Sequence, residues 1–294
     1  MRAQYDDFKE GLRSVTGRVC LVLFLDVLAF SIVIPILPNL ILNMVDGDAG
    51  RAAFLQGAAS SLDGALKFFM QPFLGRLSDS VGRKPVLAYS LIGSALSFGL
   101  YVVAPSIPTL FISHALHGLT QCTFLIAMSS VADAARWFIF IYHHLNYGET
   151  NPKKILDNPS DPSSLTHAFG LIGVSLGTAF VLGPILGGAL AEIIGFRAIY
   201  AMSSLLFIAT VLALRWYMIE TLDISARKQF LWSEAVPLRS ARTVMSRSRG
   251  LSILALAYFL CSLTVGGRFL RASLPSHATD SRPQFIQCGS CTPR

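Results

Sequence analysis

Five ionisable side chains interrupt the apolar stretches of this chain. They are one aspartate, one aspartate–lysine pair and one histidine pair: Asp26, Asp63, Lys67, His114 and His117. An ionisable residue inside a long apolar segment usually faces a cavity, a partner or a solute path. Carboxylates and imidazoles can also take up and release protons. These residues therefore suggest proton or solute handling inside a membrane.

Asp63 and Lys67 are four residues apart, so a helix places them on one face near the middle of their segment. A buried ion pair is costly, which favours a polar cavity or a protonation site. A pair that neutralises itself and fixes helix packing is the alternative, and both interpretations stay open.

His114 and His117 are three residues apart and share a helix face. No carboxylate or cysteine accompanies them in the pattern, so we expect no metal. Cys288 and Cys291 form a Cys-x-x-Cys in a polar tail without a second pair, which is a weak zinc or redox signal.

A short charged turn, residues 75–85, lies between two apolar segments and must sit at the water interface. Gly75 is expected to let two helices approach closely, and Gly82 to adopt a positive φ in a tight reversal. We expect Asp79 and Arg83 to pair with groups on neighbouring helix ends. Lys84 completes the turn before Pro85.

Two further segments carry helix-bending or small residues. The first has Pro35 and Pro38, which remove backbone hydrogen bonds and let a helix bend as a gate. The other has small residues that let helices touch and one proline that bends its helix: Gly173, Gly177, Gly183, Pro184, Gly187 and Gly188.

Composition predicts an all-α polytopic membrane protein. Of 294 residues, 53% are hydrophobic and 14% are charged, against about 25% charged in soluble domains, and the mean hydropathy is +0.56. The net charge of +7 comes from basic residues in short loops, without a basic face that would bind nucleic acid. No cleaved signal peptide is evident. No Ser/His/Asp spacing, metal cluster or phosphate loop suggests an enzyme, and we expect no cofactor.

Seven segments could span a bilayer, with boundaries good to a few residues. They cover residues 19–42, 52–74, 86–104, 108–132, 168–194, 199–217 and 251–266. Alternate loops are basic, which places the N-terminus in the cytoplasm. Arg268 and Arg271 work against an external C-terminus after seven spans.

The expected organisation has five parts. They are a cytoplasmic N-terminus (1–18), six helices (19–217), a cytoplasmic linker (218–250), a seventh helix (251–267) and a polar tail (268–294). Residues 136–161 interrupt what should be a short loop, as an interfacial segment or as an insertion.

Three of these patterns, in the same order and on corresponding helices, resemble the major facilitator superfamily, and within it the drug:H⁺ and tetracycline/proton antiporters. They are Asp-x8-Pro-x2-Pro from Asp26, Gly-x3-Asp-x2-Gly-Arg-Lys from Gly75, and Gly-x5-Gly-Pro-x2-Gly-Gly from Gly177. The resemblance covers residues 19–220 and implies the six-helix half of a facilitator fold. Only one helix of a second half follows, so the chain has the pattern of an amino-terminal fragment.

The resemblance also implies roles for single residues. Asp26 would couple substrate or proton to conformational change; an ion-pair anchor near the cytoplasmic interface is the alternative. Asp133 would pair with Arg83 and latch the cytoplasmic side. Two positions depart from the family pattern, because His114 falls where an arginine is usual and Ser80 where a basic residue is usual.

The first function hypothesis is a secondary transporter that moves a small organic solute by alternating access, with proton coupling and with the lipid bilayer as its surroundings. The second is a truncated membrane protein that does not transport, such as an assembly partner, a regulator or a defective half. A G-protein-coupled receptor is disfavoured by the inward N-terminus, the motif order and the long linker. The sequence does not name the substrate, the membrane or the oligomeric state.

Overall fold

The computed structural model describes residues 2–147 and 162–222, with isolated positions and short stretches between 227 and 260. In this part of the chain all regular structure is helical, which confirms the all-α expectation. The helices are α1 (Arg2–Ser31), α2 (Leu37–Met44), α3 (Ala49–Val81), α4 (Arg83–Val103), α5 (Ile107–Thr120), α6 (Thr123–Tyr147) and α8 (Pro162–Tyr217).

Four stretches of the described chain are long and apolar enough to cross a bilayer: Ser14–Ser31, Arg83–Val103, Ile107–Ala135 and Thr166–Tyr217. The last is 52 residues long and is interrupted at Gly195, whose φ of 77° is not helical, so it accounts for two of the predicted spans. Helix α3 is not among the four. Its 33 residues are long enough at about 1.5 Å each, but it carries the Asp63–Lys67 pair and several serines and glycines.

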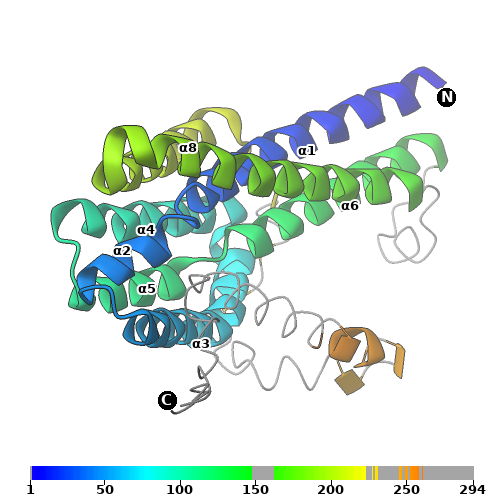
Figure 1. Ribbon diagram of the computed structural model, residues 1–294. Helices are drawn as coiled ribbons and strands as arrows, with labels where there is room; N and C mark the ends of the chain where they lie inside the picture. Colours follow the sequence, from blue (N-terminus) through cyan, green and yellow to red (C-terminus); the bar gives the residue numbers. More distant parts are fainter. Residues whose placement is uncertain are drawn as a thin grey trace, which may run out of the picture.

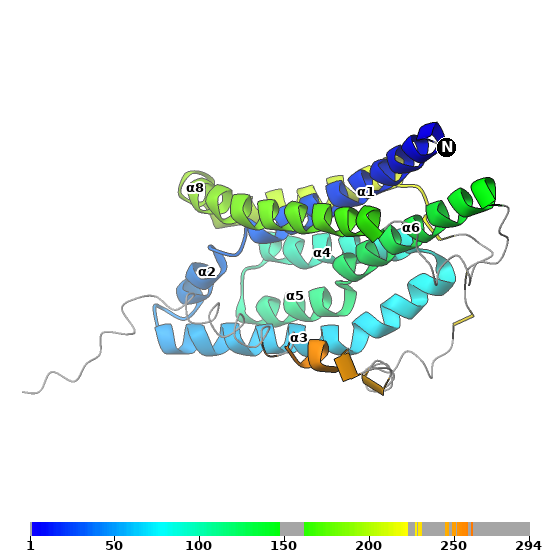
Figure 2. The same cartoon turned by 90° about the vertical axis from the view of Figure 1, so that its right-hand side faces the viewer.

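The helices form a bundle in layers (Figures 1 and 2). Helix α1 packs most widely against α8, α4 packs on α8 and α5, and α5 in turn packs on α3. Large side chains that are fully buried, such as Leu23, Leu91, Ile126 and Phe207, join α1, α4, α6 and α8 in one apolar core. Figure 2 shows that α3 bends along its length, and Pro72 inside it removes a backbone hydrogen bond.

The predicted break near Pro35 and Pro38 is present. Helix α1 ends at Ser31, and the next residues turn through hydrogen bonds to the third residue back, such as Ile36 N–H to the Val33 carbonyl at 3.0 Å. Pro38 then lies in the first turn of α2, where its missing N–H costs nothing. Two prolines thus divide the expected first span into a long helix and a short one.

The expected fourth span is also divided into two helices, and this break was not predicted from the sequence. Helix α5 ends at Thr120, Gln121 has an extended backbone (φ −71°, ψ 109°), and α6 begins at Thr123. Neither glycine nor proline stands at this break. The Ser90 side chain of α4 replaces part of the lost backbone bonding, because the Cys122 N–H donates to Ser90 Oγ at 2.9 Å.

Helix α8 approaches α1 through two of its predicted small residues. A Cβ atom on Gly183 would overlap Ser31, and one on Gly187 would overlap the Ile32 backbone carbonyl. Gly173, Gly177 and Gly188 have no atom within 4 Å of such a position. Close packing is therefore confined to Gly183 and Gly187. The non-helical backbone of α8 falls at Gly195, while Pro184 lies inside the helix and its bending role stays a prediction.

Three of the predicted regions lie partly or wholly outside the described residues. Helix α6 continues through residues 136–147, so this stretch extends the fourth span, while residues 148–161 are not described. Residues 252–257 are helical within the predicted seventh helix. Most of the linker and the whole 268–294 tail fall outside the described chain.

Candidate functional site

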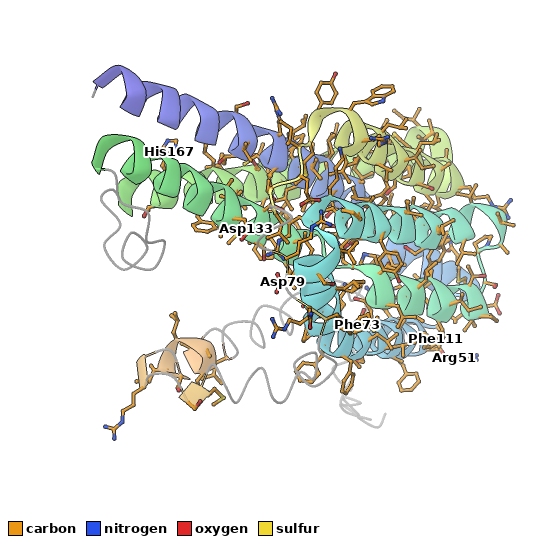
Figure 3. The ribbon with its side chains drawn as sticks, turned by 180° about the vertical axis from the view of Figure 1, so that it is seen from behind. Arg51, Phe73, Asp79, Phe111, Asp133 and His167 are labelled. Atoms are coloured by element: carbon orange, nitrogen blue, oxygen red, sulfur yellow. The ribbon has the colours of Figure 1, made fainter. Side chains whose placement is uncertain are left out.

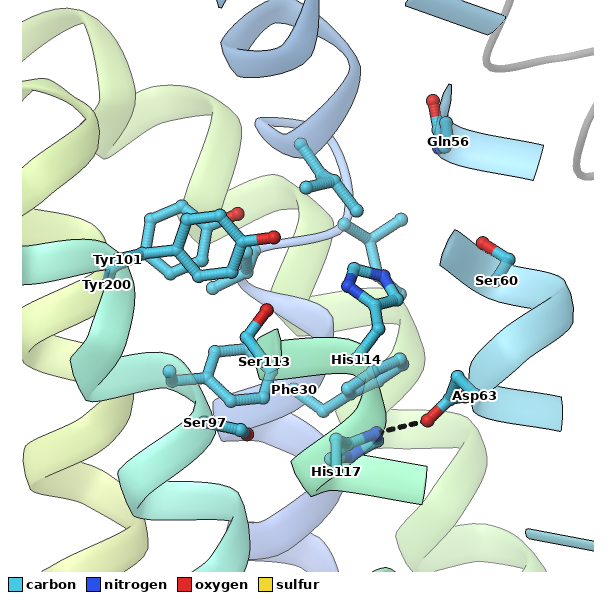
Figure 4. Close-up of a pocket in the computed structure, with 14 residues that line it drawn as sticks. Phe30, Gln56, Ser60, Asp63, Ser97, Tyr101, Ser113, His114, His117 and Tyr200 are labelled. Carbon is cyan, nitrogen blue, oxygen red and sulfur yellow. Dashed lines mark hydrogen bonds and ion pairs between the residues drawn. The ribbon is translucent and has the colours of Figure 1, made fainter. Parts of the chain in front are cut away.

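A cavity of about 140 Å³ lies between α1, α3, α4, α5 and α8 (Figure 4). Most of its wall is apolar and aromatic, with a few polar groups, which is the usual make-up of a small-molecule site. The lining residues are Phe30, Val33, Ile34, Leu37, Gln56, Ser60, Asp63, Ser97, Phe98, Tyr101, Ser113, His114, His117 and Tyr200.

Asp63 is the centre of a charged cluster at one side of the cavity. Its Oδ2 accepts from Lys67 Nζ at 2.7 Å, and its Oδ1 accepts from His117 Nδ1 at 3.0 Å. A carboxylate accepts only, so Nδ1 of His117 carries a hydrogen, and in the neutral ring Nε2 holds a lone pair. That Nε2 is buried and has no hydrogen-bond partner among the described residues.

The His117 ring is held between two aromatic side chains. Phe30 of α1 stacks on it with ring centroids 5.7 Å apart, and Phe98 of α4 meets it edge-on at 6.0 Å. Helices α1, α3 and α4 therefore all touch this one residue of α5. A change in the charge of His117 would be felt on each of them.

His114 lies one turn earlier on α5 and points into the cavity (Figure 4). Its Nδ1 is 2.9 Å from the Leu110 carbonyl oxygen. A carbonyl can only accept, so Nδ1–H donates and the neutral ring offers Nε2 as an acceptor. His114 and His117 share a helix face as predicted, but their rings have different hydrogen-bond partners. In the described chain no three His, Cys, Asp or Glu side chains gather as a metal site would require.

Asp26 occupies a second polar cluster, outside the cavity lining. Its side chain is 2% exposed, and Thr123 Oγ1, at the start of α6, lies 3.3 Å from its Oδ1. The same hydroxyl lies 3.2 Å from Gln121 Oε1, and its one hydrogen can serve only one of these acceptors at a time. Ser90 Oγ donates to Gln121 Oε1 at 2.9 Å.

The two clusters share helix α1, because Phe30 follows Asp26 by one helical turn and stacks on His117. Three of the five predicted residues line the cavity, Lys67 joins them through Asp63, and Asp26 stands apart. Sequence reasoning missed Gln121, Tyr101 and Tyr200. An uncharged amide or phenol inside an apolar run carries too weak a signal on its own.

The charged turn predicted over residues 75–85 is mostly helical, because residues 75–81 continue α3, Gly82 alone breaks the helix and α4 begins at Arg83. This segment nevertheless forms the expected pairs at the far end of the bundle. Arg83 is buried, and its guanidinium contacts Asp79 at 2.7 Å, Asp133 at 2.8 Å and Ser78 Oγ at 2.6 Å. Figure 3 shows Asp79 and Asp133 close together and well separated from Arg51 at the opposite end. The ion pair between Asp133 and Arg83 that the resemblance implied is therefore present; its action as a latch stays a prediction.

Structural roles were predicted for two glycines of the charged turn. Gly82 has a positive φ of 121° as predicted, and a Cβ there would also lie 2.7 Å from Glu220 Oε2. A Cβ added to Gly75 would lie 3.4 Å from Leu125, an ordinary van der Waals distance, so the close approach at Gly75 is modest.

Glu220 is a partner of the turn that the prediction omitted. Its carboxylate accepts from the backbone N–H groups of Arg83 at 2.9 Å and Lys84 at 3.1 Å. It thereby caps the start of α4, where unpaired N–H groups carry partial positive charge. Lys84 Nζ in turn donates to the carbonyls of Arg215 and Met218 at the end of α8. The start of α4 thus donates four hydrogen bonds to residues 215–220 and is held to the end of α8.

Removing the Glu220 carboxylate should loosen this end of the bundle. We expect Glu220→Ala to lower the free energy of unfolding by about 1–2 kcal/mol, as for the loss of a helix cap with its charge. The measurement is thermal unfolding of the purified protein in detergent. The exposed Glu192 of α8 serves as the control, and Glu192→Ala should leave the midpoint unchanged. Equal midpoints for the two variants would contradict the capping role.

Comparisons with known proteins agree with this architecture. Residues 19–136 and 157–282 match the model of the Major Facilitator Superfamily. Tetracycline resistance protein, class G, of Vibrio anguillarum is 31% identical over 182 residues, which are 62% of this chain and 39% of that protein. The class B protein of Escherichia coli is 25% identical over 252 residues, which are 86% of this chain and 55% of that protein.

The fold is also that of a solved structure, the crystal structure of the human organic anion transporter MFSD10 (TETRAN). It aligns with a TM-score of 0.58 and 22% identity over 74% of this chain and 50% of that one. The chain spans about half the length, or less, of the curated relatives it matches. With its apolar helices and the matched family model, the chain is an integral multi-pass membrane protein that belongs to the Major Facilitator Superfamily.

Proposed function

We propose that the chain supplies the amino-terminal half of a secondary transporter that exchanges protons for a small organic solute by alternating access. Members of this family alternate between two openings by rocking two six-helix halves around a central site. The cavity lined by Asp63, His114 and His117 is the contribution of this half to that site. We expect no catalytic step.

The observation that carries the proposal is that helix α1 connects two ionisable clusters, because it contains Asp26 and contacts His117 through Phe30. Asp26 is buried, makes no ion pair with any described residue and has an acceptor, Gln121, that competes with it for the Thr123 hydroxyl. A carboxylate in this setting can exchange a proton without losing a cationic partner. One turn further along α1, Phe30 stacks on His117 in the cavity.

A change at Asp26 can therefore reach the cavity through the position of α1. When Asp26 gains a proton, the Thr123 hydroxyl is free to turn to Gln121, and the attachment between α1 and the start of α6 weakens. Movement of α1 shifts Phe30 against His117 and alters the cavity wall. This would connect proton uptake with solute binding without direct contact between the two clusters.

The turn that contains Arg83 would act as the latch on the cytoplasmic side. It ties α3, α4, α6 and the end of α8 through ion pairs and a helix cap. The basic loops support a cytoplasmic N-terminus, which we include in the proposal.

Proton exchange can be tested with the 294-residue chain in lipid vesicles that contain a pH-sensitive dye. Tetracycline is the first probe, because several relatives are tetracycline resistance proteins. Adding it to one side should move protons across vesicles that hold the protein, in excess of the movement in protein-free vesicles. Equal responses in the two preparations, repeated with amphipathic dyes, would overturn the proposal and favour a membrane protein that does not transport.

A further inference from the structure

The cavity contains no unpaired charge. Asp63 is the one Asp, Glu, Lys or Arg residue among its lining side chains. Both of its oxygens are occupied, one by Lys67 Nζ at 2.7 Å and the other by His117 Nδ1 at 3.0 Å. A solute that brought a permanent charge into this space would find no free opposite charge to meet it.

Polar groups without partners gather on the rest of the wall. The hydroxyl oxygens of Tyr101 and Tyr200 are buried and have no hydrogen bond of normal geometry with the described chain, although the Ser113 hydroxyl lies beside Tyr101 and the two tyrosine rings stack at 4.5 Å. Gln56, which is 7% exposed, and Ser60, which is exposed, add an amide and a hydroxyl to the same wall. The Nε2 atom of His114 is free as an acceptor, because Nδ1–H is committed to the Leu110 carbonyl.

These groups offer hydrogen bonds of both kinds. Phenol and serine hydroxyls and the Gln56 amide N–H donate, whereas Gln56 Oε1 and neutral His114 Nε2 accept. A buried polar group that stays unpaired costs free energy, so a solute that satisfies several of them gains binding energy that an apolar one does not. The aromatic rings of Phe30, Phe98 and Tyr101 offer flat contact surfaces beside them.

We infer that this cavity selects an uncharged, flat amphipathic solute whose polar end both donates and accepts hydrogen bonds, such as an aromatic amide or alcohol. The inference rests on the proposed function, because it names the class of solute that would be exchanged for protons. Organic anions and permanent cations are disfavoured. Burying either one beside the paired Asp63 carries a desolvation cost that no described side chain offsets.

Protonation of the site works in the same direction. The ionisable groups that face His114 and His117 are Asp63 and Lys67 from α3, Tyr101 from α4 and Tyr200 from α8, while α1 presents Phe30. A proton on His114 Nε2 turns that acceptor into a donor and adds a charge. A solute whose N–H or O–H is bound there is then released, so proton and solute exclude each other at one atom.

The test compares three naphthalene probes that differ in the charge of one substituent. They are 2-naphthamide, 2-naphthoate and 2-naphthylmethyl-trimethylammonium, bound at neutral pH to the full chain in lipid nanodiscs and measured by equilibrium dialysis against empty nanodiscs. We expect the amide to bind at least about tenfold more tightly than either charged probe. Equal or tighter binding of a charged probe, or no detectable binding of the amide, would overturn the inference.

Variants place the probes in this cavity. Gln56→Leu and His114→Phe should each weaken amide binding about fivefold, which is the effect of losing one hydrogen bond. Ile112→Phe should leave amide binding unchanged, because Ile112 lies on the exposed face of α5, the helix that carries His114. Gln56→Glu adds an unpaired carboxylate and should transfer the preference to the ammonium probe. Unchanged preference in Gln56→Glu would show that the probes bind elsewhere and would contradict the inference.

The outcomes also separate this inference from the transport proposal. Probe binding is measured at equilibrium and without a proton gradient. Amide preference without proton movement in vesicles would overturn only the proposed function. Proton movement together with preference for a charged probe would overturn only the choice of solute.

Discussion

Gly187→Ala is expected to destabilise the protein by about 3 kcal/mol, whereas Gly188→Ala leaves it unchanged or slightly more stable. A Cβ on Gly187 overlaps the backbone carbonyl of Ile32, and backbone atoms cannot rotate away as a side chain can. Overpacking of this kind costs about 1–3 kcal/mol or more. Alanine gains about 1 kcal/mol of helix propensity over glycine at both positions, so the neighbouring variant isolates the packing term.

The measurement for this pair is thermal unfolding in detergent followed by circular dichroism. A loss of 3 kcal/mol corresponds to a midpoint lower by roughly 6–12 °C for a chain of this size. Gly188 has no atom within 4 Å of the new methyl group and should show no decrease. If both variants unfold at the same temperature, α8 does not rest on α1 at this point.

Asp63→Ala is expected to be more damaging than Lys67→Ala, and the double variant should resemble Lys67→Ala alone. Asp63 holds two partners, Lys67 and His117, so its loss leaves an ammonium group without a counter-charge inside the bundle. Breaking a fully buried pair costs about 3–5 kcal/mol; with side chains 25% and 18% exposed, we expect about 2 kcal/mol.

Unfolding midpoints of the wild type, both single variants and the double variant form a thermodynamic cycle. The stability lost in Asp63→Ala should be partly recovered when Lys67 is also replaced. If the two single losses simply add, the side chains do not interact and the cavity lacks the paired charge on which its solute preference depends.

Local features of the fold could be predicted where one residue type has one physical consequence. Pro35 and Pro38 have no N–H to donate to a helical hydrogen bond, and helix α1 ends just before them, at Ser31. Gly82 adopts the positive φ that its place in a tight turn requires. The apolar runs likewise give the helices, with ends shifted by a few residues.

The break at Gln121 could not be predicted, because nothing in the local sequence forbids a helix there. It depends on Ser90, 31 residues earlier on α4, which bonds the Gln121 amide and the Cys122 N–H. The break at Gly195, by contrast, falls in the turn predicted between the spans 168–194 and 199–217, although this glycine itself was not singled out. The described chain has four stretches that are long and apolar enough to cross a bilayer, whereas seven spans were predicted. Helix α3 is too polar to be among them, two predicted spans are joined in α8, and residues 251–266 are mostly undescribed.

The grouping of the site residues also lay beyond the sequence. The pair at Asp63 and Lys67 follows from helical spacing, but its third member, His117, is 54 residues away from Asp63 and joins it only because α3 packs on α5. Asp26 was expected at the same site and lies in a separate cluster. Side-chain contacts between distant segments are set by packing, which spacing within one helix does not report.

Exchange of Asp26 for asparagine tests the central claim most directly. Two fluxes are compared in vesicles: solute movement driven by a pH gradient, and exchange of labelled for unlabelled solute without a gradient. We expect Asp26→Asn to keep the exchange and to lower the gradient-driven flux to the level of protein-free vesicles, whereas Asp48→Asn, which retains the cap at the start of α3, behaves as the wild type. A gradient-driven flux in Asp26→Asn equal to that of the wild type would show that Asp26 does not couple protons to transport.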